Sequence, residues 1–308
     1  MKSKSILAAN NGLAHMPVPV PHKNFGKMPV TRIVTTSWDD GDPSDLRVAE
    51  MLALRHIPGT FYIPVKGHVE ARHRACRMSL AGMLDLASHG FEIGAHGISH
   101  PNLPECDEKQ LIVEVESCKK RLEDNLGKSV SMFAYPRGRH NNKVIASLQH
   151  AAYTGARTTA MLARELKFDP FRMPTSVHVF PHSRLDYFRN LARVWDLRRT
   201  WAYATHFRCA ENWVELAKIL FDSVLRNGGL WHLYGHSWEI EELRLWGGLT
   251  EVLDYVSNRP GVLYLANGPV VKFRTDKCFE AESCPGSTLD SLGEAPGVRA
   301  ARERRVGV

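Results

Sequence analysis

The chain has 308 residues, of which 44% are hydrophobic and 24% charged, and its formal net charge is +7. These values are typical of a soluble protein with one large domain or two ordinary ones, and not of a fibrous or unfolded chain. No apolar segment is long enough to cross a membrane, and the first residues are too polar for a secretory signal. We therefore expect a cytoplasmic protein without a membrane span.

The two ends of the chain differ in composition from its middle. Residues 1–28 lack apolar periodicity, and residues 273–308 are rich in small, proline and charged residues. Such segments bury too little apolar surface to fold, so we expect a flexible leader, one domain over residues 29–272 and a disordered basic tail. No aromatic residue lies among the arginines of residues 299–305, so we expect a solvated tail and no nucleic-acid partner.

Segments rich in β-branched and aromatic residues alternate with segments of helical periodicity along the middle of the chain. Strands are predicted at residues 32–38, 60–65, 91–95, 131–135, 154–159, 173–179, 230–234 and 262–265. Helices are predicted at residues 44–54, 79–90, 107–126, 142–153, 212–226 and 239–256, with a further one after Ser183. The alternation predicts one α/β domain with a parallel sheet, and about seven or eight units favour a barrel over an open sheet.

Polar residues follow several of the predicted strands. Asp39 and Asp40 follow the first strand, His96 the third, Arg137 the fourth and His236 the seventh. Because the reactive groups of a β/α barrel gather at the carboxyl ends of its strands, we expect these side chains to share one cleft. The agreement between separate segments is stronger evidence than any single motif.

His96 and His100 are four residues apart, which places both imidazoles on one side of a helical turn, where they can reach one ion. The spacing alone is weak evidence for a metal site, and a structural role stays open. The chain contains two further pairs of this kind, His178/His182 and His232/His236. The preceding strand and the neighbouring glycines favour the first pair as metal ligands.

Asp39 and Asp40 precede glycine and proline, a pattern that often forms only a turn. Neighbouring side chains at the end of a strand point to opposite sides, so one carboxylate could bind an ion while the other acts as a base. His236 could protonate a leaving group, because the pKa of histidine lies near neutrality, or it could be structural. His232 lies deeper in the same strand and is the less suitable acid.

Four motifs resemble those of the polysaccharide deacetylase family, which shares the NodB homology domain and forms carbohydrate esterase family four. They are Thr36-Ser-Trp-Asp-Asp-Gly41, His96-Gly-Ile-Ser-His100, Phe133-Ala-Tyr-Pro-Arg-Gly138 and Tyr234-Gly-His-Ser-Trp-Glu239. The resemblance covers residues 30–268 and implies a distorted (β/α) barrel with about seven parallel strands.

The resemblance also implies a set of roles. Asp40, His96 and His100 would hold a divalent ion, Zn²⁺ first, with Co²⁺, Mn²⁺ or Ni²⁺ as alternatives. Asp39 would be the general base and His236 the general acid, while the backbone N–H of Arg137 would stabilise the oxyanion. The typical reaction of the family removes the acetyl group of an N-acetylhexosamine.

The third motif departs from the better-studied members of the family. They carry an arginine directly after the phenylalanine, where this chain has Ala134, and that arginine normally holds the base. Arg172 resembles an arginine of a variant branch of the family. Arg172 could therefore supply the missing charge beside Asp39, although the sequence leaves open which arginine supports this carboxylate.

Three functions are compatible with these residues. The leading one is deacetylation of an amino-sugar glycan or its biosynthetic precursor, and the second is hydrolysis of a small cyclic amide or imide. An open groove lined by the seven tryptophans would favour the glycan, and a closed pocket the small molecule. The third is a catalytically silent sugar-binding domain, although such a module needs no base beside a metal.

Overall fold

The computed structural model describes residues 30–66 and 78–282, so the predicted leader and residues 283–308 of the predicted tail lie outside the described residues. Strands are present at all eight predicted positions. They are β1 (Arg32–Asp39), β2 (Thr60–Ile63), β3 (Glu92–Ala95), β4 (Met132–Ala134), β5 (Gly155–Arg157), β6 (Val177–His178), β7 (Gly229–His236) and β8 (Leu263–Tyr264).

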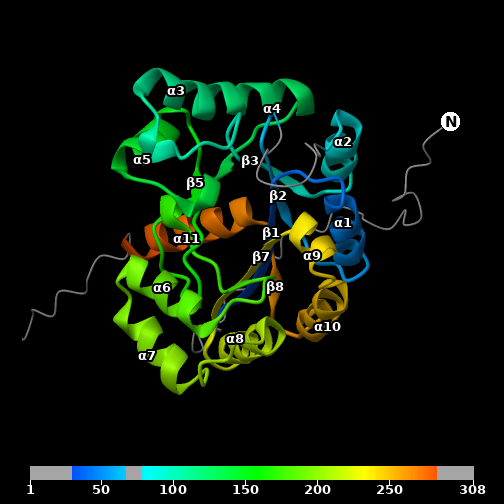
Figure 1. Cartoon of the computed structure of the whole chain (residues 1–308), viewed down its shortest axis with the longest axis vertical. Coiled ribbons are helices and arrows are strands. Elements are labelled where there is room, and N and C mark those ends of the chain that lie inside the picture. The colour runs from blue at the N-terminus through cyan, green and yellow to red at the C-terminus, as the bar shows by residue number, and fades with distance from the viewer. Residues whose placement is uncertain (1–29, 67–77, 283–308) are drawn as a thin grey trace, which may run out of the picture.

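The strands form one parallel sheet in the order β5-β4-β3-β2-β1-β7-β6, and β8 pairs with the first half of β1. The register of β1 against β7 places Asp39 opposite His236 at the carboxyl end. Irregular backbone closes the gap between β5 and β6, where the Thr158 N–H donates to the carbonyl of Met173. The predicted distorted (β/α) barrel is therefore confirmed (Figure 1).

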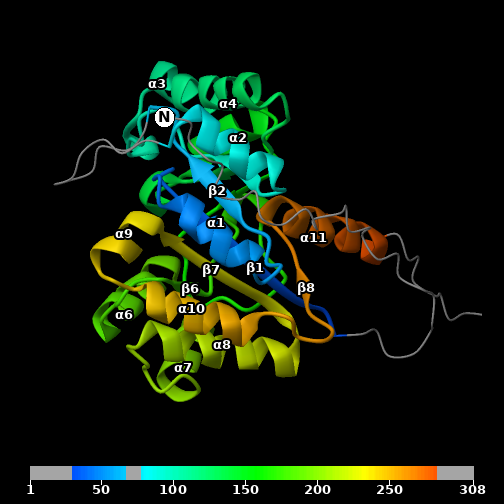
Figure 2. The same cartoon turned by 90° about the vertical axis from the view of Figure 1, so that its right-hand side faces the viewer.

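Helices cover the outside of the curled sheet, as Figures 1 and 2 show. Those at predicted positions are α1 (Asp45–Ala53), α2 (Leu80–Ser88), α3 (Glu108–Ile112), α4 (Cys118–Leu126), α5 (Asn142–His150), α6 (Arg184–Val194), α8 (Trp213–Asn227), α9 (Ser237–Glu242) and α10 (Trp246–Val256). A π-helical turn, Val113–Ser117, joins α3 to α4, and the predicted helix 239–256 is divided into α9 and α10. The sequence did not predict α7 (Leu197–Thr205) or α11 (Asn267–Glu282).

Side-chain caps explain where several helices begin. Ser79 accepts a hydrogen bond from the Gly82 N–H at the start of α2. Asp107 and Gln110 form a reciprocal capping box at the start of α3. Each cap satisfies a backbone donor that would otherwise lack a partner in the first helical turn.

The hydrophobic core has two parts, one on each face of the sheet. The larger lies between the sheet and the outer helices and includes Trp38, Phe61, Phe221 and Trp231. The smaller fills the barrel and includes Ile33, Tyr62, Met132, Leu230, Val270 and Val271. The last two come from α11, which closes the amino end of the barrel (Figure 2). The opposite end, where the strands finish, is left for a site.

No helix within residues 30–66 or 78–282 combines the length and the apolar character that a membrane span needs. The cytoplasmic location stays a prediction, as do the boundaries of the leader, domain and tail. Residues 273–282, which the sequence assigns to the tail, lie in helix α11.

Candidate active site

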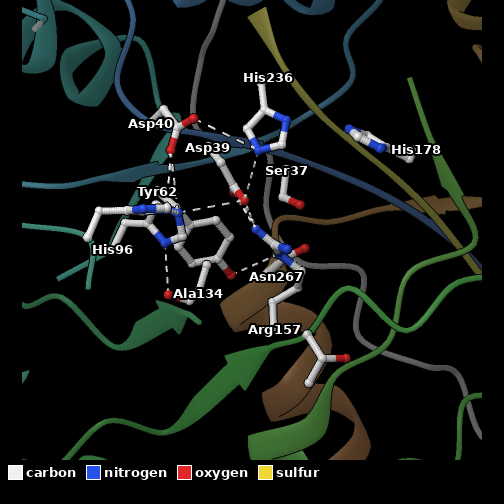
Figure 3. A network of polar contacts seen from close by, with 12 residues as sticks. Ser37, Asp39, Asp40, Tyr62, His96, Ala134, Arg157, His178, His236 and Asn267 are labelled. Atoms are coloured by element: carbon white, nitrogen blue, oxygen red, sulfur yellow. Dashed lines mark hydrogen bonds and ion pairs between the residues drawn. The ribbon is translucent and has the colours of Figure 1, made fainter. Parts of the chain in front are cut away.

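Five strands bring polar side chains to the carboxyl end of the barrel. Asp39, Arg157, His178 and His236 are the last residues of β1, β5, β6 and β7, and His96 directly follows β3. All except Arg157 line a cavity of about 510 Å³. Figure 3 shows these side chains pointing toward one another. The structure thus brings together side chains that the sequence placed on separate segments.

Asp40, His96 and His100 form a buried group at one side of this cavity. Asp40 Oδ1 lies 3.6 Å from His96 Nε2 and 3.7 Å from His100 Nε2, and the two imidazole nitrogens are 3.1 Å apart. Asp40 and His100 have φ angles of 79° and 58°, in the left-handed region that aspartate and histidine tolerate better than bulky residues. The backbone therefore aims all three ligand atoms at one point.

The donor set fits a divalent ion such as zinc. Asp40 Oδ1 is buried and has no hydrogen-bond partner within the described residues. His96 Nδ1 lies 2.8 Å from the carbonyl oxygen of Ala134, which acts as an acceptor and leaves the Nε2 lone pair facing the other ligands. The Trp238 indole N–H donates to Asp40 Oδ2 at 2.9 Å, so the remaining carboxylate oxygen is oriented toward the histidines. Two imidazoles and one carboxylate are a common set for catalytic zinc.

Asp39 is held by Arg157 and by no other arginine of the described residues. Arg157 Nη2 donates to both carboxylate oxygens of Asp39, and both side chains are buried. The guanidinium also lies between the rings of Tyr62 and Tyr234, 5.3 and 5.1 Å from their centroids. Burial alone would raise the pKa of Asp39, but Arg157, together with His96 and His236, lowers it well below its usual range.

Gly94 makes room for this arrangement. A Cβ atom at Gly94 would lie 2.4 Å from the ring of Tyr62, so a larger residue would displace the ring on which Arg157 rests. The Tyr62 hydroxyl in turn accepts a hydrogen bond from Asn267 at the start of α11. A glycine of the third strand thus supports the position of the Asp39 carboxylate.

The expectation that Arg172 supports Asp39 is wrong. Arg172 lies in the 3₁₀ turn Pro170–Arg172, where its exposed guanidinium binds Asp169 and donates to Asn142. Arg157 takes the role instead, because it is the inward-facing last residue of β5. The sequence held one signal for it, since an arginine within a predicted buried strand needs a buried partner.

A second group, Glu239 with His178 and His236, faces the first across the cavity. Glu239 Oε2 accepts a hydrogen bond from His236 Nδ1 at 2.6 Å and lies 3.2 Å from His178 Nε2. His236 Nε2 lies 3.9 Å from the nearest oxygen of Asp39 and of Asp40. Burial lowers the pKa of His236, but the carboxylates of Asp40, Glu239 and Asp39 outweigh burial and raise it to about 10. These three carboxylates thus favour the protonated form of His236.

The other residues predicted for the site are placed as follows. Arg137 lies in the turn after β4 with φ 56° and lines the same cavity. His232 is fully buried beneath the cavity, bonded to Ser37 and to the carbonyl of Pro174, which fits its exclusion as the acid. Of the seven tryptophans, all within the described residues, Trp238 alone lines the cavity. A groove lined by several tryptophans, the feature that would favour a glycan, is therefore not found at this cavity.

The barrel thus carries a group of one carboxylate and two histidines beside the buried Asp39–Arg157 pair and His236. Residues 27–156 match the family model described as polysaccharide deacetylase. The resemblance to this family is therefore confirmed over that part of the chain. No curated protein matches the sequence.

Several solved structures are similar to this chain, and the first described below has the same fold. A Mycobacterium smegmatis protein assigned provisionally as a polysaccharide deacetylase is 15% identical, with 90% of this chain and 99% of that chain covered and a TM-score of 0.54. A family 4 carbohydrate esterase from Bacillus anthracis is 14% identical, with 79% and 83% covered and a TM-score of 0.46. The Streptococcus pyogenes deacetylase PplD, in complex with acetate, is 18% identical, with 49% and 67% covered and a TM-score of 0.43.

Proposed function

We propose that the protein is a metal-dependent hydrolase that removes N-acetyl groups from an N-acetylhexosamine-containing glycan or its biosynthetic precursor. One observation carries the proposal. A buried carboxylate, Asp39, stands between a metal-fitting group and a protonated histidine, and a buried arginine keeps it ionised. The match of residues 27–156 to the polysaccharide deacetylase family supports the same reaction.

The residues of the site supply the parts of an amide hydrolysis. When bound to Asp40, His96 and His100, a divalent ion, Zn²⁺ first among the candidates, supplies polarisation of the acetyl carbonyl and a lower pKa for the attacking water. Asp39 accepts the proton of that water, and Arg157 holds Asp39 in the ionised form that can accept it. Asp39 thus lies beside the three proposed metal ligands without being one of them.

The leaving group needs a proton and the tetrahedral oxyanion needs a donor. His236, protonated and 3.9 Å from both carboxylates, donates its Nε2 proton to the amine nitrogen as the C–N bond breaks. The backbone N–H of Arg137, at the cavity wall, would stabilise the oxyanion. The products are acetate and a free amino sugar.

The shape of the cavity bears on the length of the substrate. Only Trp238 offers an indole to it, and that indole N–H is bonded to Asp40. Tyr234 and Trp238 are the two tyrosine or tryptophan side chains of the described lining, fewer than a long neutral glycan would favour. We therefore expect a short substrate, and this observation also favours the small cyclic amide as the second candidate. The base beside the ligands argues against a silent binding domain.

The test is an acetate-release assay on the purified full chain. N-acetylglucosamine and its oligomers, with Zn²⁺, Co²⁺ or Mn²⁺, should release acetate, and a cyclic amide such as hydantoin should not be opened. The variant Asp39→Asn should reduce release by at least about 10²-fold while the metal content stays near that of the wild type. Asp186→Asn, at the wall of the same cavity, is the matched control and should stay active. Full activity of Asp39→Asn would remove this residue as the base.

A further inference from the structure

A second cavity, of about 740 Å³, lies beside the catalytic one, and Thr159 and Arg193 line both. Arg193 is in the last turn of α6, and its Nη2 donates to Thr159 Oγ1 at 2.9 Å. The turn after β4 approaches the same threonine closely, because a Cβ atom at Gly138 would lie 2.1 Å from Thr159 Oγ1. The two cavities therefore adjoin at Thr159 and Arg193.

The wall of the second cavity carries more positive than negative charge. Arg139, Lys167 and Arg193 line it with exposed side chains, and none of the three forms an ion pair with a carboxylate of residues 30–66 or 78–274. The other wall cations are paired, Arg172 with Asp169 and Arg199 with Asp196. The remaining wall carboxylate, Glu105, accepts a hydrogen bond from Asn102.

Arg139 and Arg193 both belong to segments that meet at Thr159. Arg139 directly follows Gly138, which contacts this threonine, and Arg193 is bonded to its hydroxyl. Guanidinium groups bind phosphate and carboxylate through paired N–H donors, whereas a neutral sugar hydroxyl gains little from a cation. Uncompensated arginines at the junction of two cavities therefore suit an oxyanion and not a neutral glycan.

We propose that the second cavity binds an anionic group of the substrate, a phosphate or a carboxylate, while the N-acetyl group lies between Asp39 and His236. This inference rests on the proposed deacetylase function and narrows its substrate to an acidic amino sugar. Arg193 and Arg139 bind the anion, and Lys167 adds positive charge to the same wall. Neutral chitin-type chains would leave this charge unused.

The experiment compares three sugars on the metal-loaded full chain. N-acetylglucosamine is neutral, N-acetylglucosamine 6-phosphate carries a phosphate, and N-acetylmuramic acid carries a carboxylate. Calorimetry with the Asp39→Asn variant gives Kd without turnover, and acetate release by the wild type gives kcat/KM. At least one acidic sugar should bind about tenfold more tightly than the neutral one, as one charge-assisted hydrogen bond allows. The sugar with the larger gain identifies the anionic group.

Variants locate the binding site. Arg193→Gln and Arg139→Gln should each raise the Kd of the preferred acidic sugar about tenfold and leave the Kd of the neutral sugar unchanged. Arg198→Gln, an exposed arginine of α7 outside both cavities, removes the same charge and should change neither Kd. These side chains are exposed, so the variants are expected to fold.

Two results would overturn the inference. One is equal affinity for the neutral and both acidic sugars, and the other is an acidic preference that persists when Arg139 and Arg193 are both replaced. Turnover of all sugars without acidic preference would leave the deacetylase function standing and remove only the anion site. Arginine-dependent binding of an acidic sugar without release of acetate would support the anion site and contradict the deacetylase function.

Discussion

The two sides of the catalytic cavity carry similar side chains in different states. On one side, Asp40 Oδ1 lies 3.6 and 3.7 Å from the facing nitrogens of His96 and His100, beyond hydrogen-bond distance. On the other side, Glu239 Oε2 lies 2.6 and 3.2 Å from nitrogens of His236 and His178. In both groups the candidate ligand atoms lie within 4.8 Å of one another.

The difference teaches that proximity of ligand atoms does not by itself define a metal site. The Glu239 carboxylate accepts a hydrogen bond from His236 Nδ1, whereas Asp40 Oδ1 is buried without a hydrogen-bond partner in the described residues. A buried carboxylate oxygen without a donor costs free energy that a cation would recover. We therefore assign the ion to the Asp40 group and the handling of protons to the Glu239 group.

The largest expected effect separates the two groups by metal content. His96→Gln should lose the bound ion and reduce acetate release by about 10³-fold or more, because several kcal/mol of catalysis depend on the ion. His178→Gln removes an equivalent imidazole from the other group and should keep wild-type metal content. Elemental analysis of both variants after dialysis is the measurement. Metal retained in the first variant and lost in the second would reverse the assignment.

The next effect concerns the buried pair that fixes Asp39. Arg157→Met leaves that carboxylate buried without its cation, which should cost about 3–5 kcal/mol of unfolding free energy. The pKa of Asp39 should rise, so activity, which needs the ionised base, should fall as the pH drops through the raised value. Urea unfolding and the pH dependence of kcat/KM measure both consequences. Arg172→Met is the matched control and should change neither, because Arg172 contacts only exposed partners.

That control also shows how far the sequence predicted the site. Residues that directly follow a strand, such as Asp40, His96 and His236, could be collected because a parallel barrel brings strand ends together. Arg157 is the last residue of its strand, and the direction of its side chain depends on the register of β5 with β4. A sequence pattern does not give that register, and the motif resemblance indicates Arg172 instead.

The fold, like the site, is only partly predictable from the sequence. The strands were predictable because β-branched and aromatic runs recur at regular spacing, whereas α11 was missed because the composition of residues 275–308 resembles that of a solvated tail. Its role comes from tertiary contact, since Val270 and Val271 fill the amino end of the barrel. Glu239 was likewise noted only as part of a motif, because its position between two histidines depends on β6 lying beside β7.

A smaller effect tests whether the second group handles protons. Glu239 raises the pKa of His236, so Glu239→Gln should lower that pKa. The general acid must be protonated, and activity is therefore lost as the pH rises through its pKa. The alkaline limb of the kcat profile should move to lower pH. Metal content should not change. An unchanged alkaline limb would show that Glu239 does not set the pKa of the general acid.

The smallest expected effect on activity concerns His182, which is bonded to His178 of the Glu239 group. His182 Nε2 lies 2.9 Å from His178 Nδ1, and burial, followed by the neighbouring His178, lowers the pKa of His182 to about 4. A neutral side chain that does not touch Glu239 should matter little, so His182→Gln should reduce kcat by less than about threefold, the cost of one neutral hydrogen bond or less. His178→Gln should cost more, because His178 contacts Glu239 directly. Equal losses in the two variants would contradict the view that only direct contacts with Glu239 affect His236. They would indicate that protons pass through His182, His178, Glu239 and His236.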